Sequence, residues 1–169
     1  MVLFGPCDIA QPRPTRIAVL DLGTTATGSR AASEIRKIFQ AGEPRESRPE
    51  FELVDQDQSR AAALGAGFKG SLNLGVPEAR DLGSAMACDF FFVGEAQTVK
   101  RSPSTGPDYY ESYATVFLVS ARTGRLVLWE RPAIQGDSPG AAEKALLATL
   151  GSDESRQRYV VAIRRARED

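Results

Sequence analysis

The segment RIAVLDLGTTATGSR, residues 16–30, decides the class of fold. It opens with a short apolar run, which is typical of a buried strand, and passes through glycines and threonines into a stretch with helical periodicity. A helix is predicted over residues 28–41, with Ser29 as its candidate cap and Gly42 as its stop. The apolar residues at helical spacing are Ile35, Ile38 and Phe39. A strand that leads directly into a helix indicates an α/β fold.

The turn at residues 21–25, Asp-Leu-Gly-Thr-Thr, resembles the start of the phosphate loop in actin-like and sugar-kinase-like ATPases. In those enzymes the strand turns back into a second antiparallel strand, whereas the helix predicted over residues 28–41 leaves no room for such a hairpin. Their adenosine-binding half would also require about twice the length of this chain. We therefore expect that Asp21 coordinates no metal-nucleotide.

A smaller ligand-binding role of the same turn remains open. Backbone amides between a strand and the N-terminus of a helix favour anions, and the candidate residues here are Gly23, Thr24, Thr25 and Gly28. Binding of a small ligand or a nucleotide at this loop is the alternative function. The turn contains neither Gly-Lys-Ser/Thr nor Gly-x-Gly-x-x-Gly. A purely structural connection between strand and helix is therefore the favoured interpretation.

Composition excludes several classes of function. The chain has 169 residues, enough for one domain, and its 21 Lys and Arg oppose 22 Asp and Glu for a net charge of −1. This balance gives no electrostatic basis for binding nucleic acid. No histidine is present, so Ser-His-Asp and Cys-His catalysis and the common zinc sites are excluded. No apolar stretch approaches the roughly 20 residues of a transmembrane helix. We expect a protein that has no cofactor and is not an enzyme.

The remaining patterns predict a single-domain mixed sheet flanked by helices. The apolar run at residues 90–93 is typical of a strand buried on both faces, hence of a central strand. Gly124 lies in a tight turn, which predicts an antiparallel hairpin, whereas strands joined through helices predict parallel crossovers. Strands are predicted over residues 51–54, 89–99, 109–120 and 125–134, and helices over residues 55–67, 76–88 and 138–151. The candidate caps are Asp55 or Asp57 for the first of these helices and Ser138 for the last, with Pro139 at its first position.

The chain divides into three predicted parts. Residues 1–15 form an irregular leader, residues 16–151 form the α/β domain, and residues 152–169 form a C-terminal strand or a basic tail. The leader has neither the basic start nor the apolar run of a signal peptide. The protein is therefore expected either to be cytoplasmic or to be exported by a signal or lipid anchor that this sequence does not show.

Four stretches, in this order, carry a resemblance to a known family: RIAVLDLG (16–23), FELVDQDQSRAAAL (51–64), GVPEARDLGSAMACDFFFVGEAQTV (75–99) and VFLVSARTGRLVLW (116–129). The chain resembles the CsgG-like and TolB N-terminal domains of the bacterial envelope, together with the related lipoproteins that activate penicillin-binding proteins. Cys88 departs from the alanine that is usual in this family. The long amphipathic segment of the curli pore is missing, so pore formation is not implied.

The resemblance implies a binding or scaffold domain that is periplasmic or associated with the outer membrane. Its implied partner is another envelope protein or a second copy of the chain, and a removed signal or lipid anchor would attach it peripherally to a membrane. The candidate protein-contact residues are aromatic, since such residues are rich in interface hot spots. They are Tyr109, Tyr110, Tyr113 and Trp129. The alternative interpretation of these side chains is packing between neighbouring strands.

Two sets of charged residues have both a functional and a structural interpretation. Glu95, Glu111 and Glu130 lie on neighbouring predicted strands, but no segment is available to build the deep cleft of a carboxylate pair. Arg164, Arg165 and Arg167 form a basic run, which is commonly a solvated tail but also fits lipid headgroups or an acidic partner.

Overall fold

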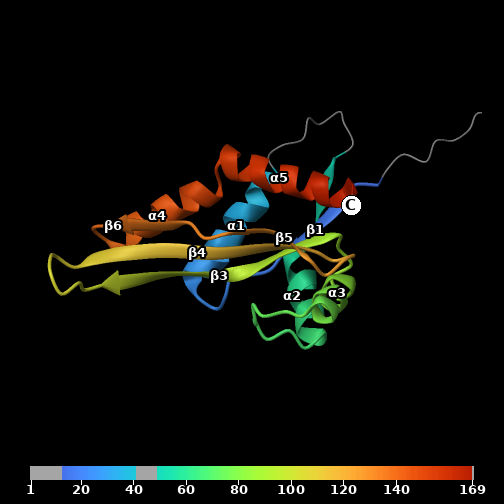
Figure 1. Ribbon diagram of the computed structural model, residues 1–169, viewed down its shortest axis with the longest axis horizontal. Coiled ribbons are helices and arrows are strands. Elements are labelled where there is room, and N and C mark those ends of the chain that lie inside the picture. Colours follow the sequence, from blue (N-terminus) through green and yellow to red (C-terminus); the bar gives the residue numbers. More distant parts are fainter. Residues whose placement is uncertain (1–12, 41–48, 169) are drawn as a thin grey trace, which may run out of the picture.

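The computed structural model describes residues 13–40 and 49–168, and its centre is a sheet covered by helices (Figure 1). The strands are β1 (Thr15–Val19), β2 (Phe51–Leu53), β3 (Phe90–Arg101), β4 (Tyr109–Ser120), β5 (Leu126–Glu130) and β6 (Ala133–Gly136). The helices are α1 (Ala26–Gln40), α2 (Gln56–Gly65), α3 (Val76–Ala85), α4 (Pro139–Leu150) and α5 (Asp153–Glu168).

The sheet is mixed, which confirms the predicted fold class. Its strand order is β2-β1-β3-β4-β5, with β6 paired to β4 further along the same strand. β1 lies parallel to both β2 and β3, whereas β3 and β4 form an antiparallel hairpin that pairs Phe90 with Ser120 and Arg101 with Tyr109. β3 occupies the middle of the order, as its apolar run predicted.

Two hydrophobic layers flank the sheet because its side chains alternate between its faces. Phe90 and Phe92 belong to the larger layer, which includes residues of α1, α4 and α5. Phe91 and Val93 belong to the smaller layer, which α2 and α3 cover. Figure 1 shows the consequence: the β3–β4 hairpin extends well beyond α2 and α3, which lie under only one end of the sheet.

Several local predictions are confirmed in detail. α1 spans residues 26–40, close to the predicted range, and buries one apolar face. The predicted cap was wrong, because Ser29 lies within α1 and the Oγ1 atom of Thr25 accepts the hydrogen bond from the Gly28 amide. The predicted stop at Gly42 lies outside the described residues. Asp55 caps α2 by accepting hydrogen bonds from two backbone amides, and Ser138 caps α4, in which Pro139 is the first residue. Gly124 has a φ of 68°, the left-handed conformation that the β4–β5 turn requires.

The C-terminal segment differs from the prediction. Neither a strand nor a tail follows residue 152, because residues 153–168 form helix α5. Tyr159, Val160 and Ile163 lie on one side of this helix and are buried in the larger hydrophobic layer. Their spacing of one and four residues fits a helix face, and the intervening charged residues remain exposed.

The predicted return strand at residues 125–134 is in fact two strands. β5 ends at Glu130 and β6 begins at Ala133, so Arg131 and Pro132 interrupt the pairing with β4. Proline has no backbone N–H to donate to a ladder, which accounts for the break.

None of the helices in the described part of the chain combines the length and hydrophobicity that a bilayer crossing requires.

Candidate protein-contact site

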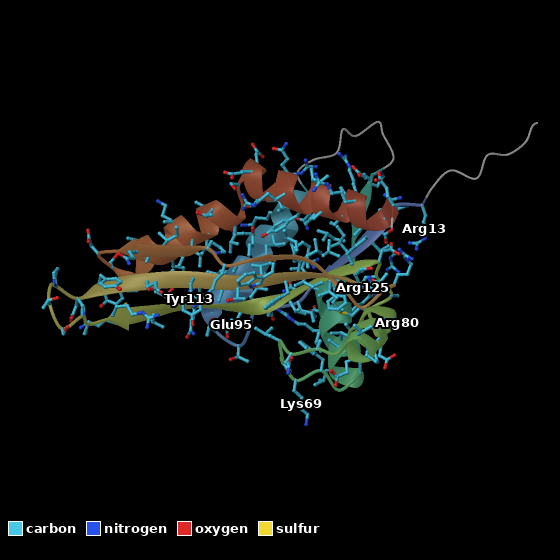
Figure 2. The ribbon with its side chains drawn as sticks, viewed as in Figure 1. Arg13, Lys69, Arg80, Glu95, Tyr113 and Arg125 are labelled. Carbon is cyan, nitrogen blue, oxygen red and sulfur yellow. The ribbon has the colours of Figure 1, made fainter. Side chains whose placement is uncertain are left out.

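The part of the sheet that α2 and α3 leave uncovered presents a continuous surface, here called the open sheet face. It begins beyond Gly94 and carries side chains from four strands and from the β5–β6 connection. Figure 2 shows Glu95 and Tyr113 on this stretch, away from the two small helices. The cross-strand registers and the contact of Arg131 with the Tyr113 ring place the following residues on it: Glu95, Gln97, Val99, Arg101, Tyr109, Glu111, Tyr113, Thr115, Phe117, Trp129, Arg131, Ala133 and Gln135.

Aromatic side chains dominate the middle of the open sheet face. Trp129 pairs with Phe117 across the β4–β5 ladder, and 56% of its surface is exposed to solvent. Tyr113 lies further along β4 and is buried, because the guanidinium of Arg131 sits 5.2 Å from its ring centroid and Gln97 hydrogen-bonds to its hydroxyl. A tryptophan, a tyrosine and an arginine on one uncovered face form the combination that dominates interface hot spots.

The structure divides the predicted aromatic cluster between two faces. Tyr109, Tyr113 and Trp129 share the open sheet face, but Tyr110 points to the opposite side, where it pairs with Gly136. Adjacent residues of a strand always alternate in this way. Tyr109 is also remote from Trp129, since it pairs with Arg101 at the far end of the hairpin. Trp129 and Tyr113 remain as the candidate contact residues at its centre.

The Gly23–Gly28 loop is bound tightly by groups of the chain itself. Thr25 Oγ1 accepts a hydrogen bond from the Gly28 amide at 2.9 Å and donates one to the Ala96 carbonyl at 2.5 Å. Gly28 lies so close to the Leu22 carbonyl that a Cβ would overlap it, and Gly23 has a φ of 81°. Thr24 is exposed and makes no hydrogen bond through its side chain within the described residues.

A carboxylate of the chain already lies beside the first turn of α1. Glu143 of α4 accepts hydrogen bonds from Thr27 Oγ1 at 2.6 Å and from Arg30 Nη2 at 3.1 Å. A negative side chain stabilises the N-terminus of a helix in the way a bound anion would. These contacts favour the structural interpretation of the loop, and anion binding at Gly23, Thr24, Thr25 and Gly28 stays a prediction.

Asp21 also has partners within the protein. Arg60 of α2 forms a bidentate pair with it, with distances of 2.9 Å from Nε to Oδ2 and 3.0 Å from Nη2 to Oδ1. Gln56 donates a third hydrogen bond at 3.2 Å. Bidentate arginine pairs fix geometry as well as charge. Asp21, whose position resembles that of a metal-nucleotide ligand, therefore connects the segment after β1 to α2 through these hydrogen bonds.

Replacing Thr25 with valine is expected to lower the free energy of unfolding by about 1–2 kcal/mol, because the change removes a helix cap and a second hydrogen bond. Thr24→Val is the matched control and should change stability by less than about 0.5 kcal/mol, as exposed substitutions commonly do. Urea unfolding of both variants measures the difference. Equal effects of the two substitutions would contradict the structural role of Thr25.

The three glutamates of the strands do not converge. Glu95 and Glu111 share the open sheet face but pair with Thr115 and Val99, which lie well apart along the hairpin. Glu111 forms an ion pair with Arg101 at 3.2 Å. Glu130 points to the opposite face, toward α5. Within residues 13–40 and 49–168 there is also no cluster of three or more His, Cys, Asp or Glu that fits a metal ion.

Glu130 connects β5 to α5. Its carboxylate accepts a hydrogen bond from the buried Tyr159 hydroxyl and forms an ion pair with Arg158 at 3.2 Å. Burial, followed by the charge of Glu130 and its hydrogen bond, raises the pKa of Tyr159 above its ordinary value of 10.0. Tyr159 is therefore held neutral in the folded protein over a pH range in which an unfolded chain loses that proton.

This raised pKa predicts a loss of stability at high pH. Above pH 10 Tyr159 loses its proton in the unfolded state but keeps it in the folded state. Its contribution to the free energy of unfolding is therefore complete below pH 10 and declines as the pH rises above that value. The decline should reach about 1.4 kcal/mol at pH 11. Urea unfolding at pH 8 and pH 11 measures it, with Tyr159→Phe as the variant that lacks this titration. Parallel stability losses in the two proteins would contradict the assignment.

A groove between β5 and α5, here called the basic groove, was not predicted from the sequence. It encloses about 730 Å³, and its walls include Leu126, Val127 and Leu128 of β5 and Arg158, Val161 and Arg165 of α5. Arg125 stands at its end, and a second hollow of about 320 Å³ continues past Ser120 and Ala166. The groove exists only because residues 153–168 are helical and dock beside β5.

Comparison with known proteins supports the fold. No family model and no curated protein sequence matches the chain. Among solved structures, the chain is similar to lipoprotein GNA1162 from Neisseria meningitidis, with a TM-score of 0.55, 15% identity, and coverage of 86% of this chain and 99% of that one. It is also similar to a hypothetical protein from Chlamydia trachomatis, with a TM-score of 0.51, 11% identity, and coverage of 81% and 93%. The chain thus shares its fold with these two proteins.

Proposed function

We propose that this chain is a non-enzymatic binding domain of the bacterial cell envelope that acts through protein–protein contacts. The observation that carries the proposal is the open sheet face, on which Trp129 is 56% exposed beside Phe117 and close to the Tyr113–Arg131 pair. An exposed tryptophan on an uncovered sheet face is characteristic of a surface that another protein covers.

The envelope location has separate support. Lipoprotein GNA1162 shares the fold over nearly its whole length, and four stretches of the sequence resemble the CsgG-like and TolB N-terminal domains. We assign the chain to that group of envelope domains and place it in the periplasm or at the outer membrane. The non-enzymatic part of the proposal is supported by the chemistry of the candidate groups, because the histidine-free chain separates its strand glutamates and pairs Asp21 with Arg60.

Substitution of Trp129 tests the contact surface. The immobilised full chain is expected to retain one or a few specific proteins from the envelope fraction of the organism that carries the gene. Trp129→Ala should weaken the binding of the purified partner at least tenfold, since central aromatic residues carry much of the energy of an interface. Surface plasmon resonance with the purified partner measures the dissociation constant.

The matched control is Leu64→Ala on α2. Leu64 is 75% exposed, so this change removes a comparable exposed apolar side chain from another surface and should leave binding unchanged. Equal affinities of the Trp129 and Leu64 variants would contradict the open sheet face as the contact site. Fractionation of cells that express the complete gene tests the location, and recovery in the cytosol alone would refute the envelope assignment.

A further inference from the structure

Exposed large apolar residues concentrate around one edge of the sheet. β5 is the last strand of the order, so only one of its sides is paired with another strand. In the described part of the chain, five large apolar side chains are exposed, and three of them surround this strand. Leu126 and Trp129 belong to β5, and Val161 faces it from α5 across the basic groove. An unpaired strand edge with apolar flanks is a template for another strand.

One face of β5 borders the basic groove, and the other face belongs to the open sheet face. Val127 and Leu128 line the basic groove and pack against the larger hydrophobic layer. Leu126 and Trp129 pair with Val119 and Phe117, which face the other side of the sheet, because the β4–β5 register shifts beside Leu118. A strand added beside β5 would alternate its side chains in the same way. Every second side chain would enter the groove toward α5, and the others would lie beside Trp129. One extended segment can therefore use the exposed apolar residues on both faces.

The charges that line the basic groove indicate which kind of peptide segment would bind beside β5. Arg158 forms ion pairs with both Glu130 and Glu154, at 3.2 and 2.9 Å, so these three side chains together carry one net negative charge. Arg125 and Arg165 line the same groove and form no ion pair with any described residue. Arg122, in the adjoining hollow, is likewise without an ion pair in the part of the chain that the structure describes. The arginines that line the groove and the adjoining hollow outnumber the carboxylates, so the net charge of this surface is positive, which complements acidic side chains.

We propose that the β5 edge binds an extended, acidic segment of a partner protein by strand addition. Backbone hydrogen bonds to β5 hold the segment, apolar side chains cover Leu126 and Val161, and carboxylates meet Arg125 and Arg165. The site accepts about five residues in register, because β5 comprises five residues and Pro132 ends the edge. This inference rests on the proposed function, since it names the chemistry of the partner and the strand through which contact is made.

Selection from a phage library of random eight-residue peptides on the full chain tests the proposal. Enriched peptides are expected to be net acidic, with apolar residues at every second position. Fluorescence anisotropy of a labelled selected peptide should give a dissociation constant that rises at least tenfold in the Arg125→Glu/Arg165→Glu double variant, since each reversal replaces attraction with repulsion. The matched control is Lys69→Glu/Lys144→Glu, which changes the net charge equally on other surfaces and should leave the affinity unchanged.

A second measurement tests strand addition itself. Hydrogen exchange should slow at backbone amides within residues 126–130 when the peptide binds, and methylation of alternate peptide nitrogens should abolish binding. Enrichment without acidic bias, equal affinities of the two double variants, or no added protection in β5 would overturn the proposal. Self-association of the chain through the same arginines, detected by light scattering, would overturn it as well, because the occupant would then be a second copy.

The two proposals fail in different ways. If the selection yields no acidic peptides while Trp129→Ala abolishes binding of an envelope protein, the strand inference falls and the contact function stands. If acidic peptides bind the β5 edge but no envelope protein is retained, the envelope function falls while the edge remains a binding site.

Discussion

Phe92→Ala is expected to lower the free energy of unfolding by about 3–5 kcal/mol, the largest effect of any single change considered for this protein. The Phe92 side chain is completely buried, and its ring lies 5.8 Å from that of Phe39 and 5.1 Å from that of Tyr159. Its backbone pairs with Val19 on one side and Leu118 on the other. Truncation would leave a cavity where the sheet meets both α1 and α5.

Chemical denaturation at neutral pH measures this effect. For a chain of this size the melting temperature should fall by roughly 10 °C, because each kcal/mol corresponds to a few degrees. Leu64→Ala serves as the control, since its exposed side chain should contribute less than about 0.5 kcal/mol. A loss below about 1.5 kcal/mol for Phe92→Ala would show that the ring does not lie at the centre of the core.

Gly94→Ala is the second large prediction, with an expected destabilisation of about 3 kcal/mol. A Cβ on Gly94 would overlap the carbonyl oxygen of Thr115 on the neighbouring strand and would lie 3.1 Å from the Leu22 side chain. The overlapped atom belongs to the backbone of the β3–β4 ladder, so relief requires the two strands to separate. Gly94 also marks the boundary between the covered part of the sheet and the open sheet face.

Gly140→Ala is the matched control for this substitution. Gly140 lies in the first turn of α4, and no atom outside its own helix approaches the position of its Cβ within 4 Å. Alanine there should stabilise the protein by roughly 0.5 kcal/mol, because it favours the helix and restricts the unfolded chain. If one Gly→Ala change lowers the free energy of unfolding and the other raises it, the space around each Cβ, and not the loss of a glycine, determines the effect on stability. A neutral Gly94→Ala would contradict the close approach of the strands.

Local chemistry allowed much of this fold to be predicted. The apolar run at residues 90–93 needs cover on both faces, which placed β3 in the middle of the sheet. Asp55 and Ser138 marked helix starts because their side chains satisfy free amides, and Gly124 marked the hairpin because only glycine adopts its backbone angle readily. Each of these signals depends on a few neighbouring residues, so no knowledge of tertiary contacts was necessary.

The two main errors have different causes, and the first concerns a feature that depends on distant contacts. The apolar run at residues 159–163 is short enough for either a strand or a helix, and its packing against the larger hydrophobic layer decides for the helix. The basic groove therefore had no signal of its own in the sequence. For the aromatic residues, strand alternation could have separated Tyr110 from Tyr109 and Tyr113. These residues were predicted to form one cluster because they are close in the sequence. Neighbouring side chains of a strand point to opposite faces of the sheet, so the strand separates them.

The position of β1 between β2 and β3 has a consequence for the order in which the protein folds. The β3–β4 hairpin joins strands that are close in the chain, whereas the contact between Arg16 and Asp89 spans 73 residues. Closing a long loop is slower than closing a short one, so we expect the hairpin to assemble early and the N-terminal strand to insert beside it late. A newly synthesised chain would thus keep β1 unpaired with β3 until residues 90–101 had left the ribosome.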